Sequence, residues 1–293
     1  MSEISPALYR AGSGEPIVLV HGFTGCWMHW HPLLADLAAR YEVIAPAGAG
    51  HDGGPVFPAN LPITTSNGAD ALEAQLGELG IDTAHFVGNS MGGALVLEMA
   101  KRGRARSVVA LAPAGGWSVG DGEAKRVGRF FARQIRLARM SAPRLGTIMK
   151  RPASRRLALR EVMRHGELMS PAEAVEFAAA SLRCTVSQGT IQALREDSPQ
   201  TVVGDLDRIT CPVLLASPQF DRILPADRHA PRYRREIPGV EYRTLPDCGH
   251  VPMWDDARLI TRMIVDFVDR HTATDEQASR TEGTPGNQAV VGA

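Results

Sequence analysis

Polar and apolar positions along the chain follow two alternating patterns, short apolar runs and longer amphipathic segments. The apolar runs are typical of strands buried in a parallel sheet, and the amphipathic segments are typical of the helices that connect such strands. This alternation predicts an α/β fold with a mostly parallel sheet flanked by helices. We expect strands at 16–20, 42–46, 85–87, 107–111, 212–216 and 240–245, and helices near 30–40, 69–79, 94–102 and 257–270.

The alternation stops after Pro113 and resumes at Pro212. Between these points the chain contains amphipathic helical segments and no run that predicts a strand. The segment at the end of the chain is rich in Thr, Gly, Ala and Gln and has few large apolar residues, which predicts disorder. We therefore expect an α/β core formed by residues 1–115 and 206–271, a helical cap inserted at 116–205, and a disordered tail at 272–293.

Composition narrows the classes of function. A length of 293 residues is enough for one large α/β domain with an insertion. Basic and acidic residues number 32 each, so the overall charge does not favour a nucleic-acid partner. The four cysteines form no CxxC pair, which favours reduced thiols in a cytoplasmic protein. We expect no signal peptide and no transmembrane segment, because no apolar stretch approaches the roughly 20 residues that span a bilayer.

A candidate nucleophile, Ser90, lies where an expected strand meets an expected helix. Gly88 and Gly92 flank it at two residues on either side, and glycine relieves crowding in a sharp turn because it lacks a Cβ. A serine hydroxyl becomes nucleophilic when a base removes its proton. The free N–H groups of the following helix can stabilise an oxyanion. The GxSxG pattern alone also fits a simple turn, so its meaning depends on partner residues.

Asp221 and His250 are the candidate partners, and each follows the end of an expected strand. The carboxyl ends of parallel strands lie at the edge of the sheet where ligands bind. Taken singly, Asp221 fits a surface turn and His250 a capping or core histidine. Together with Ser90 they stand in the order nucleophile, acid, base, which favours a catalytic triad. Asp247 and Asp121 remain alternative acids.

Several segments resemble the α/β-hydrolase superfamily, in the order that this family has. They are His21-Gly22-Phe23-Thr24-Gly25, Gly88-Asn89-Ser90-Met91-Gly92-Gly93, Phe220-Asp221-Arg222 and Gly249-His250. The resemblance covers roughly residues 8–271 and implies the α/β-hydrolase fold. It also implies a catalytic triad of Ser90, Asp221 and His250, with an oxyanion hole formed by the backbone N–H groups of Phe23 and Met91. The implied activity is hydrolysis of a carboxylic ester or related acyl bond through an acyl-enzyme, without cofactor or metal.

Other members of this superfamily provide alternative activities. Haloalkane dehalogenases and epoxide hydrolases use an aspartate nucleophile where this chain has Ser90, which argues against both chemistries. The run around Asn89 is similar to that of carbon–carbon bond hydrolases of aromatic degradation, so cleavage of a meta-cleavage product by the same triad is an alternative. Those enzymes commonly carry tryptophan where this chain has Val251. A non-catalytic ligand-binding protein on the same fold is a second alternative.

Two further motifs suggest other kinds of site. Residues 48–53 match GxGxxG after an expected strand, but Gly54 and two prolines follow where a dinucleotide fingerprint requires a helix. We therefore expect no dinucleotide cofactor. His29 and His31 stand near His21, but no cysteine or carboxylate pair lies at ligand spacing, which favours a helix entry over a metal site.

The expected cap is strongly basic. Between residues 121 and 164 we count 13 Lys or Arg against three acids, a local net charge of about +10. Arg126, Arg129, Arg133 and Arg136 recur at helical spacing. A solvated helix with its apolar side on the core explains this pattern, and peripheral contact with anionic lipid or a negatively charged acyl carrier is the alternative. Methionines in the same segment fit either ordinary core filling or an adaptable pocket for a small-molecule acyl or aromatic substrate.

Overall fold

The computed structural model describes the backbone of residues 2–282 and the side chains of residues 2–272. The described residues contain an eight-stranded sheet in the order β1-β2-β4-β3-β5-β6-β7-β8. The pairs β1–β2 and β2–β4 are antiparallel, and the other neighbours are parallel, which confirms the mostly parallel sheet. The strands are β1 (Glu3–Ile4), β2 (Leu8–Ala11), β3 (Pro16–Val20), β4 (Glu42–Pro46), β5 (Ala84–Asn89), β6 (Ala105–Leu111), β7 (Val213–Pro218) and β8 (Glu241–Leu245).

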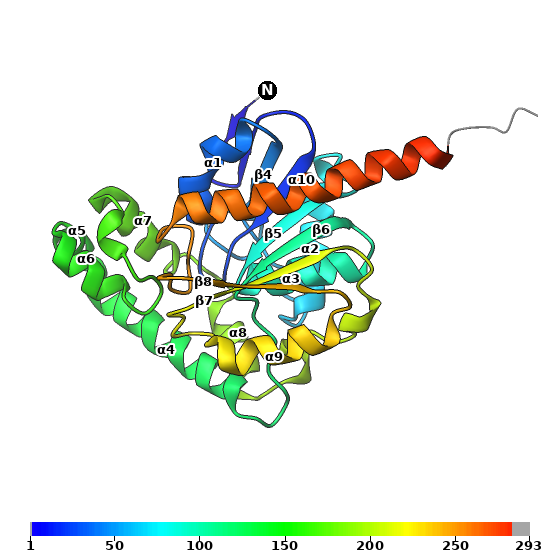
Figure 1. Cartoon of the computed structure of the whole chain (residues 1–293). Coiled ribbons are helices and arrows are strands. Elements are labelled where there is room, and N and C mark those ends of the chain that lie inside the picture. The colour runs from blue at the N-terminus through cyan, green and yellow to red at the C-terminus, as the bar shows by residue number, and fades with distance from the viewer. Residues whose placement is uncertain (1, 283–293) are drawn as a thin grey trace, which may run out of the picture.

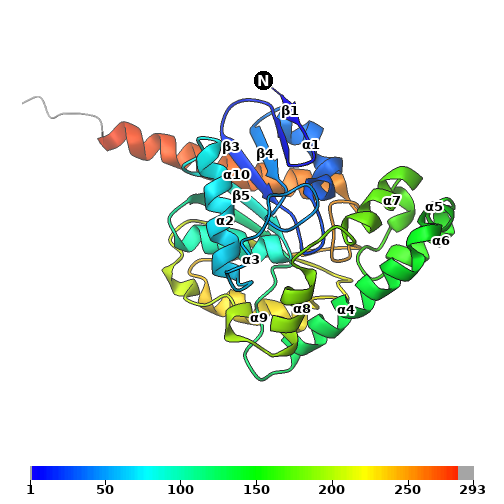
Figure 2. The same ribbon diagram turned by 180° about the vertical axis from the view of Figure 1, so that it is seen from behind.

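Helices cover both faces of the sheet. One layer contains α2 (Thr65–Glu78), α3 (Met91–Lys101) and α9 (Ala226–Glu236), and the opposite layer contains α1 (His31–Ala38) and α10 (Ala257–Glu282) (Figures 1 and 2). Successive residues of β3 alternate between the layers: Val18 and Val20 pack with the first layer, and Ile17 and Leu19 pack with the second. Burial of both faces explains why the central strands read as unbroken apolar runs.

The remaining α-helices of the described chain all lie between β6 and β7, and the described residues contain no strand in that segment. They are α4 (Glu123–Ser141), α5 (Leu145–Met149), α6 (Pro152–Leu159), α7 (Pro171–Ala180) and α8 (Ser187–Arg195). Helix α4 packs along α8 and forms an outer edge of the molecule, and α5, α6 and α7 gather at one end (Figures 1 and 2). We call residues 116–205 the insertion. Its apolar side, which includes Val127 and Ile135, is buried.

The sequence pattern does not predict the first two strands or helix α9. Strands β1 and β2 are very short and pair antiparallel, and an ion pair between Arg10 and Glu42 at 2.6 Å joins β2 to β4. Helix α9 is highly polar and contains Pro231, a residue that usually interrupts helices. Tertiary packing, through buried Tyr233, holds α9 on the sheet despite this weak local preference.

The C-terminal helix is longer than the sequence suggests. Helix α10 continues to Glu282 and so includes the first part of the segment 272–293 for which composition predicts disorder. Neither glycine nor proline occurs between 272 and 282 to end the helix, whereas Gly283 follows directly. Residues 283–293 lie outside the described residues. Among the helices described, none has both the length and the apolar character needed to cross a bilayer.

Candidate active site

Ser90 occupies the turn between β5 and α3. Its φ of 58° and ψ of −116° are strained for a residue with a side chain. Three backbone hydrogen bonds hold this conformation: Ser90 N–H donates to Leu111 O at 2.9 Å, and Ser90 O accepts from Ala94 N at 3.1 Å and from Ala114 N at 2.9 Å. The strain is therefore fixed by the neighbouring strand, helix and loop, and it presents the hydroxyl above the carboxyl edge of the sheet.

The flanking glycines are required by close backbone contact. A Cβ added at Gly88 would lie 2.2 Å from the carbonyl oxygen of Gly92, and one added at Gly92 would lie 2.0 Å from the carbonyl oxygen of Val20. Both distances are far below contact between non-bonded atoms, so any side chain at either position would push the turn apart. The GxSxG pattern therefore reflects packing at a sharp strand-to-helix turn.

His250 and Asp221 form a buried pair next to this turn. The Nδ1–H of His250 donates to Asp221 Oδ2 at 2.7 Å. The other oxygen, Asp221 Oδ1, accepts backbone N–H groups of Ile223 and Leu224, both at 2.8 Å. Burial alone would raise the pKa of the Asp221 carboxyl, but the charge and hydrogen bond of His250, with these two N–H groups, outweigh burial and lower it. The carboxylate therefore stays ionised in a buried position.

The structure places the predicted serine on the same cavity as the histidine. Ser90 and His250 both line a cavity of about 600 Å³, and both are buried, with exposed fractions of 5% and 4%. Within the part of the chain that the structure describes, the Ser90 hydroxyl has no hydrogen bond. The hydrogen bond between a serine hydroxyl and its histidine base is often long before substrate binds. The observation that relates Ser90 to His250 is therefore the cavity that both residues line.

The two alternative acids lie elsewhere. Asp247 is exposed and bonds to His165 at 2.9 Å and to Arg164 at 3.1 Å. Asp121 accepts the backbone N–H groups of Ser118 and Glu123 at the start of α4. Neither carboxylate contacts His250, whereas Asp221 does. The geometry therefore favours Asp221 as the partner of His250.

The predicted oxyanion donors flank Ser90. Met91 is the first residue of α3, so its N–H has no acceptor within the helix. The turn that holds Phe23 packs directly against Ser90, since a Cβ added at Gly22 would lie 3.3 Å from Ser90 Cβ. A hydrogen bond from Gly25 N to Gly22 O at 3.0 Å closes that turn. The two backbone segments that carry Phe23 and Met91 thus lie next to Ser90.

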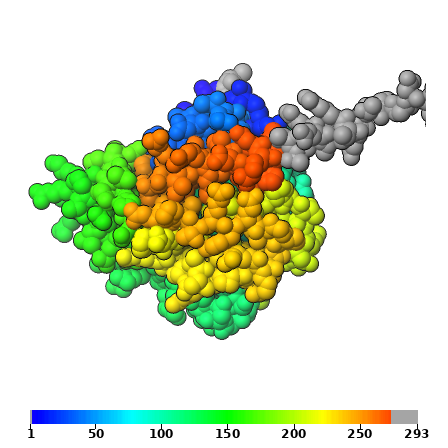
Figure 3. All heavy atoms as spheres, in the orientation of Figure 1, coloured from blue at the N-terminus to red at the C-terminus, as the bar shows by residue number. Residues whose placement is uncertain are grey.

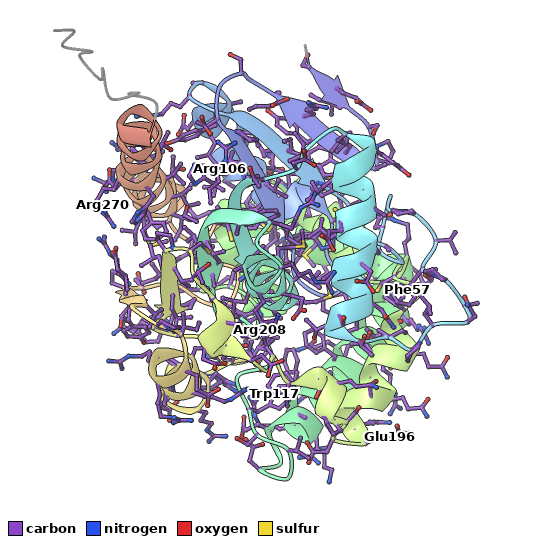
Figure 4. The ribbon with its side chains drawn as sticks, turned by 90° about the vertical axis from the view of Figure 1, so that its right-hand side faces the viewer. Phe57, Arg106, Trp117, Glu196, Arg208 and Arg270 are labelled. Carbon is purple, nitrogen blue, oxygen red and sulfur yellow. The ribbon has the colours of Figure 1, made fainter. Side chains whose placement is uncertain are left out.

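A second, smaller cavity meets the first at Ser90. It measures about 140 Å³, and its walls are mostly apolar. Phe23, Ser90 and Phe131 line both cavities, whereas Met91 lines only the smaller one and His250 only the larger. Figure 4 shows two further residues of the smaller cavity: Phe57 lies beside α2, and Trp117 lies at the end of the molecule that also carries Glu196. Ser90 therefore lies where two cavities of different size meet.

Sequence patterns did not identify Asp255, which organises the loop that carries His250. Its buried carboxylate accepts three backbone N–H groups: Gly249 at 2.6 Å, His165 at 2.7 Å and Arg164 at 3.0 Å. The last two belong to the insertion, so one side chain joins the insertion to the histidine loop. Asn89 supports the same loop from β5, because its side-chain amide donates to the carbonyl oxygen of His250 at 3.0 Å.

Asp255→Asn is expected to destabilise the fold by about 2 kcal/mol, because an amide oxygen cannot accept at both ends of the group. The new NH₂ would face at least one of the three buried backbone donors. Urea unfolding of the variant measures this loss. Asp256→Asn is the matched control: Asp256 is exposed and caps α10 by accepting the N–H of Leu259, a role that asparagine fills equally well. Equal stability of both variants would contradict the assignment.

Three buried histidines line the cavities that meet at Ser90: His21 and His51 line the smaller one, and His29 lines the larger one. The ring centroids of His21 and His51 are 5.1 Å apart, and those of His21 and His29 are 6.4 Å apart. Burial lowers the pKa of His21 to about 4 and, with help from the neighbouring rings, the pKa values of His29 and His51 to about 3. His31 lies apart from them, with Nδ1 3.0 Å from Glu173. The described residues contain no cluster of three side chains arranged to hold a metal ion.

The GxGxxG motif at 48–53 does not open a helix. This segment forms turns after β4, and the next helix in the described chain, α2, begins at Thr65. The N–H groups that would face a pyrophosphate at a helix N-terminus are therefore not arranged here.

Comparison with known proteins identifies relatives along most of the chain. The alpha/beta hydrolase family model matches residues 17–262. A Mycobacterium tuberculosis protein named epoxide hydrolase EphH is 33% identical over 205 residues, which cover 69% of this chain and 93% of that protein. The 2-hydroxy-6-oxo-6-phenylhexa-2,4-dienoate hydrolase of Burkholderia cepacia is 25% identical over 272 residues, 89% of this chain and 90% of that protein. A solved esterase from Thermogutta terrifontis has the same fold, with a TM-score of 0.68, 21% identity, and coverage of 92% of this chain and 97% of that one.

Proposed function

The chain belongs to the α/β-hydrolase family and is a hydrolase, and from this premise we propose that it cleaves a carboxylic ester or related acyl bond. The observation that supports the proposal best is the buried pair of His250 and Asp221, 2.7 Å apart, on the cavity that Ser90 also lines. With Nδ1–H bonded to the carboxylate, Nε2 of His250 remains free to accept the hydroxyl proton of Ser90.

In the proposed mechanism the Ser90 oxygen attacks the carbonyl carbon. The carbonyl oxygen becomes an oxyanion, and the backbone N–H groups of Phe23 and Met91 donate to it. His250 then transfers the proton to the leaving group, which departs and leaves an acyl group on Ser90. Water, deprotonated by His250, attacks the acyl carbonyl and restores the free serine. Asp221 stabilises the imidazolium formed in each half of the cycle.

The two cavities support a placement of the substrate. A leaving group takes its proton from His250, so we propose that it occupies the larger cavity, which His250 lines. The acyl group then occupies the smaller cavity beside Met91, whose volume is roughly that of a cavity that holds one benzene molecule. Because Phe131 of the insertion lines both cavities, we propose that residues 116–205 act as a cap that screens the substrate from water.

The name of the mycobacterial relative raises the alternative of epoxide hydrolysis. Attack of a serine oxygen on an epoxide carbon would produce an ether on Ser90. An ether has no carbonyl for water to attack, so the enzyme would not be regenerated. The presence of serine at the nucleophile position therefore supports acyl transfer over epoxide opening.

Carbon–carbon bond hydrolysis is the second candidate. The Burkholderia relative, which is named for this reaction, matches nearly the whole chain, and the same triad would serve. Asn89, part of the run that resembles such enzymes, contacts the backbone of His250.

A non-catalytic ligand-binding role is the third candidate. All four cysteines are unpaired, which supports a reducing, cytoplasmic location for any of these functions.

Intact-mass analysis after exposure to a fluorophosphonate tests the proposal. We expect one covalent adduct on the wild type and none on Ser90→Ala, because only an activated serine attacks the probe. A panel of aryl esters, a vinylogous ketone and styrene oxide then separates the three chemistries, with turnover expected for the esters. An unlabelled wild type would refute an activated Ser90 and favour the ligand-binding role. Preferred turnover of the ketone would favour carbon–carbon cleavage.

A further inference from the structure

The larger cavity runs from the buried Ser90 and His250 to an exposed rim. The rim is formed by α4 on one side, with Arg133 and Leu137, and by the region of α6 on the other, with Leu157 and Arg160. Leu137 is 44% exposed and Leu157 is 62% exposed. Each side of the entrance to the proposed active site thus carries an exposed leucine and an arginine.

The outer face of α4 continues this pattern away from the entrance. Arg129, Arg133, Arg136 and Met140 follow one another at helical spacing, and all four are exposed, Met140 to 69%. The opposite face of α4, which includes Val127, is buried against the rest of the protein. The pattern is that of an amphipathic helix whose solvent face combines basic and apolar groups.

The basic groups of this surface are not neutralised within the protein. Within the part of the chain that the structure describes, a set of exposed basic side chains from α4 to the start of α6 forms no salt bridge. By contrast, Arg156 and Arg160 each lie near a glutamate, at 3.6 Å and 3.3 Å. The unneutralised residues are Arg129, Arg133, Arg136, Arg139, Arg144, Lys150 and Arg151.

We propose that this surface, defined by the outer face of α4 and the rim residues Leu137 and Leu157, docks on an anionic lipid bilayer. The arginines would meet lipid phosphates, and the exposed leucines and methionine would enter the apolar boundary. The proposal rests on the proposed function for its second part: the bilayer delivers a membrane-dissolved ester with a short acyl group, small enough for the smaller cavity, into the larger cavity that ends at Ser90.

The shape of the surface favours a membrane over an acidic protein. Helices α5, α6 and α7 form a lobe that projects from the molecule, and α4 runs along its outer edge (Figures 1 and 3). A projecting convex edge can reach a planar bilayer without interference from the core. The apolar groups stand singly among arginines, so they suit insertion between lipid head groups better than a continuous apolar protein interface.

Co-sedimentation with lipid vesicles tests this docking. The full chain is mixed with vesicles of phosphatidylcholine alone or with about one third phosphatidylglycerol. We expect binding only to the anionic vesicles, with release when salt is raised from about 0.1 M to about 0.5 M. The triple variant Arg129→Gln, Arg136→Gln, Arg139→Gln is expected to bind roughly a hundredfold more weakly, since each basic residue near the surface contributes about fivefold. Met140→Ser should weaken binding further.

A matched variant controls for total charge. Arg208→Gln, Arg258→Gln, Arg262→Gln removes three exposed arginines outside the insertion and should bind as the wild type does. Equal losses in both triple variants, or binding of the α4 variant at the wild-type level, would overturn the proposal. Failure to bind vesicles, combined with α4-dependent binding of an acyl carrier protein, would replace the membrane with an acidic protein.

A soluble ester separates this proposal from the proposed function. The α4 triple variant avoids the cavity lining, so we expect it to hydrolyse p-nitrophenyl butyrate at the wild-type rate while losing activity on esters embedded in anionic vesicles. Hydrolysis of the soluble ester without vesicle binding would overturn docking and leave the hydrolase assignment intact. Vesicle binding by a protein that no fluorophosphonate labels would support docking and refute the acyl-transfer mechanism.

Discussion

Asp221→Asn is expected to reduce kcat for ester hydrolysis by about 10⁴-fold while the fold stays intact. The reason lies in the hydrogen bonds of this carboxylate. Oδ1 accepts two backbone N–H groups, from Ile223 and Leu224, so an asparagine must place its oxygen there. Its NH₂ group would then face Nδ1 of His250. That contact forces Nδ1 to accept, moves the ring proton to Nε2, and removes the base that Ser90 needs.

The same geometry predicts a small change in stability. In the variant every polar group of the pair keeps a partner, and a buried charge is removed, so the urea midpoint should stay close to that of the wild type. Asp247→Asn is the matched control, because Asp247 is exposed and bonds to Arg164 and His165. We expect this control to keep its turnover. An Asp221→Asn enzyme within tenfold of the wild type would contradict the role of Asp221.

The turn at Ser90 was predictable because the contacts that shape it are local. A serine between two glycines at the junction of a strand and a helix reflects contacts within a few residues, and the structure shows those contacts as distances of 2.2 Å and 2.0 Å. The proximity of Asp221 and His250 to the carboxyl edge of the sheet was also predictable. Each follows a later strand, and parallel strands have their carboxyl ends at one edge. The central strands, buried on both faces, carry the clearest apolar pattern and were placed within a few residues.

The positions that the sequence did not reveal depend on distant partners. Asp255 resembles any surface aspartate in sequence, and its role exists only because the insertion brings Arg164 and His165 against the histidine loop. Strand β2 is stabilised by pairing with β4, and α9 by packing on the sheet, so neither carries a strong local signal. Long-range contacts of this kind cannot be inferred from spacing alone.

Acidification is expected to unfold the protein between about pH 6 and about pH 4 through His21, His29 and His51. An unfolded histidine titrates near pH 6.5, whereas burial lowers the folded pKa of His21 to about 4 and those of the other two to about 3. Because the pKa values in the folded protein are lower than those in the unfolded chain, these neutral rings give their full contribution to stability above about pH 6.5. This contribution is lost as pH falls toward the folded values, since only the unfolded chain then takes up protons.

The expected size of this effect is comparable to total stability. Below its unfolded pKa, each histidine lowers the free energy of unfolding by about 1.4 kcal/mol per pH unit. The three rings together therefore lower the free energy of unfolding by on the order of 5–8 kcal/mol by pH 4.5. Typical domains have only about 5–15 kcal/mol in total. His165 acts in the opposite direction: burial lowers its pKa, but hydrogen bonds to Asp247 and Glu167 outweigh burial and raise it. That residue is partly exposed, so its contribution is smaller.

His29 offers a clean test, because neither of its buried ring nitrogens has a hydrogen-bond partner and its ring stacks on Phe177 at 4.3 Å. In His29→Phe the stacking remains and one titrating group is lost. Urea unfolding should therefore give equal or higher stability at about pH 7.5 and a loss at about pH 5.5 that is roughly one third smaller than in the wild type. A wild-type slope in His29→Phe would mean that this ring titrates normally in the folded protein, and acid sensitivity would then have to arise from other groups.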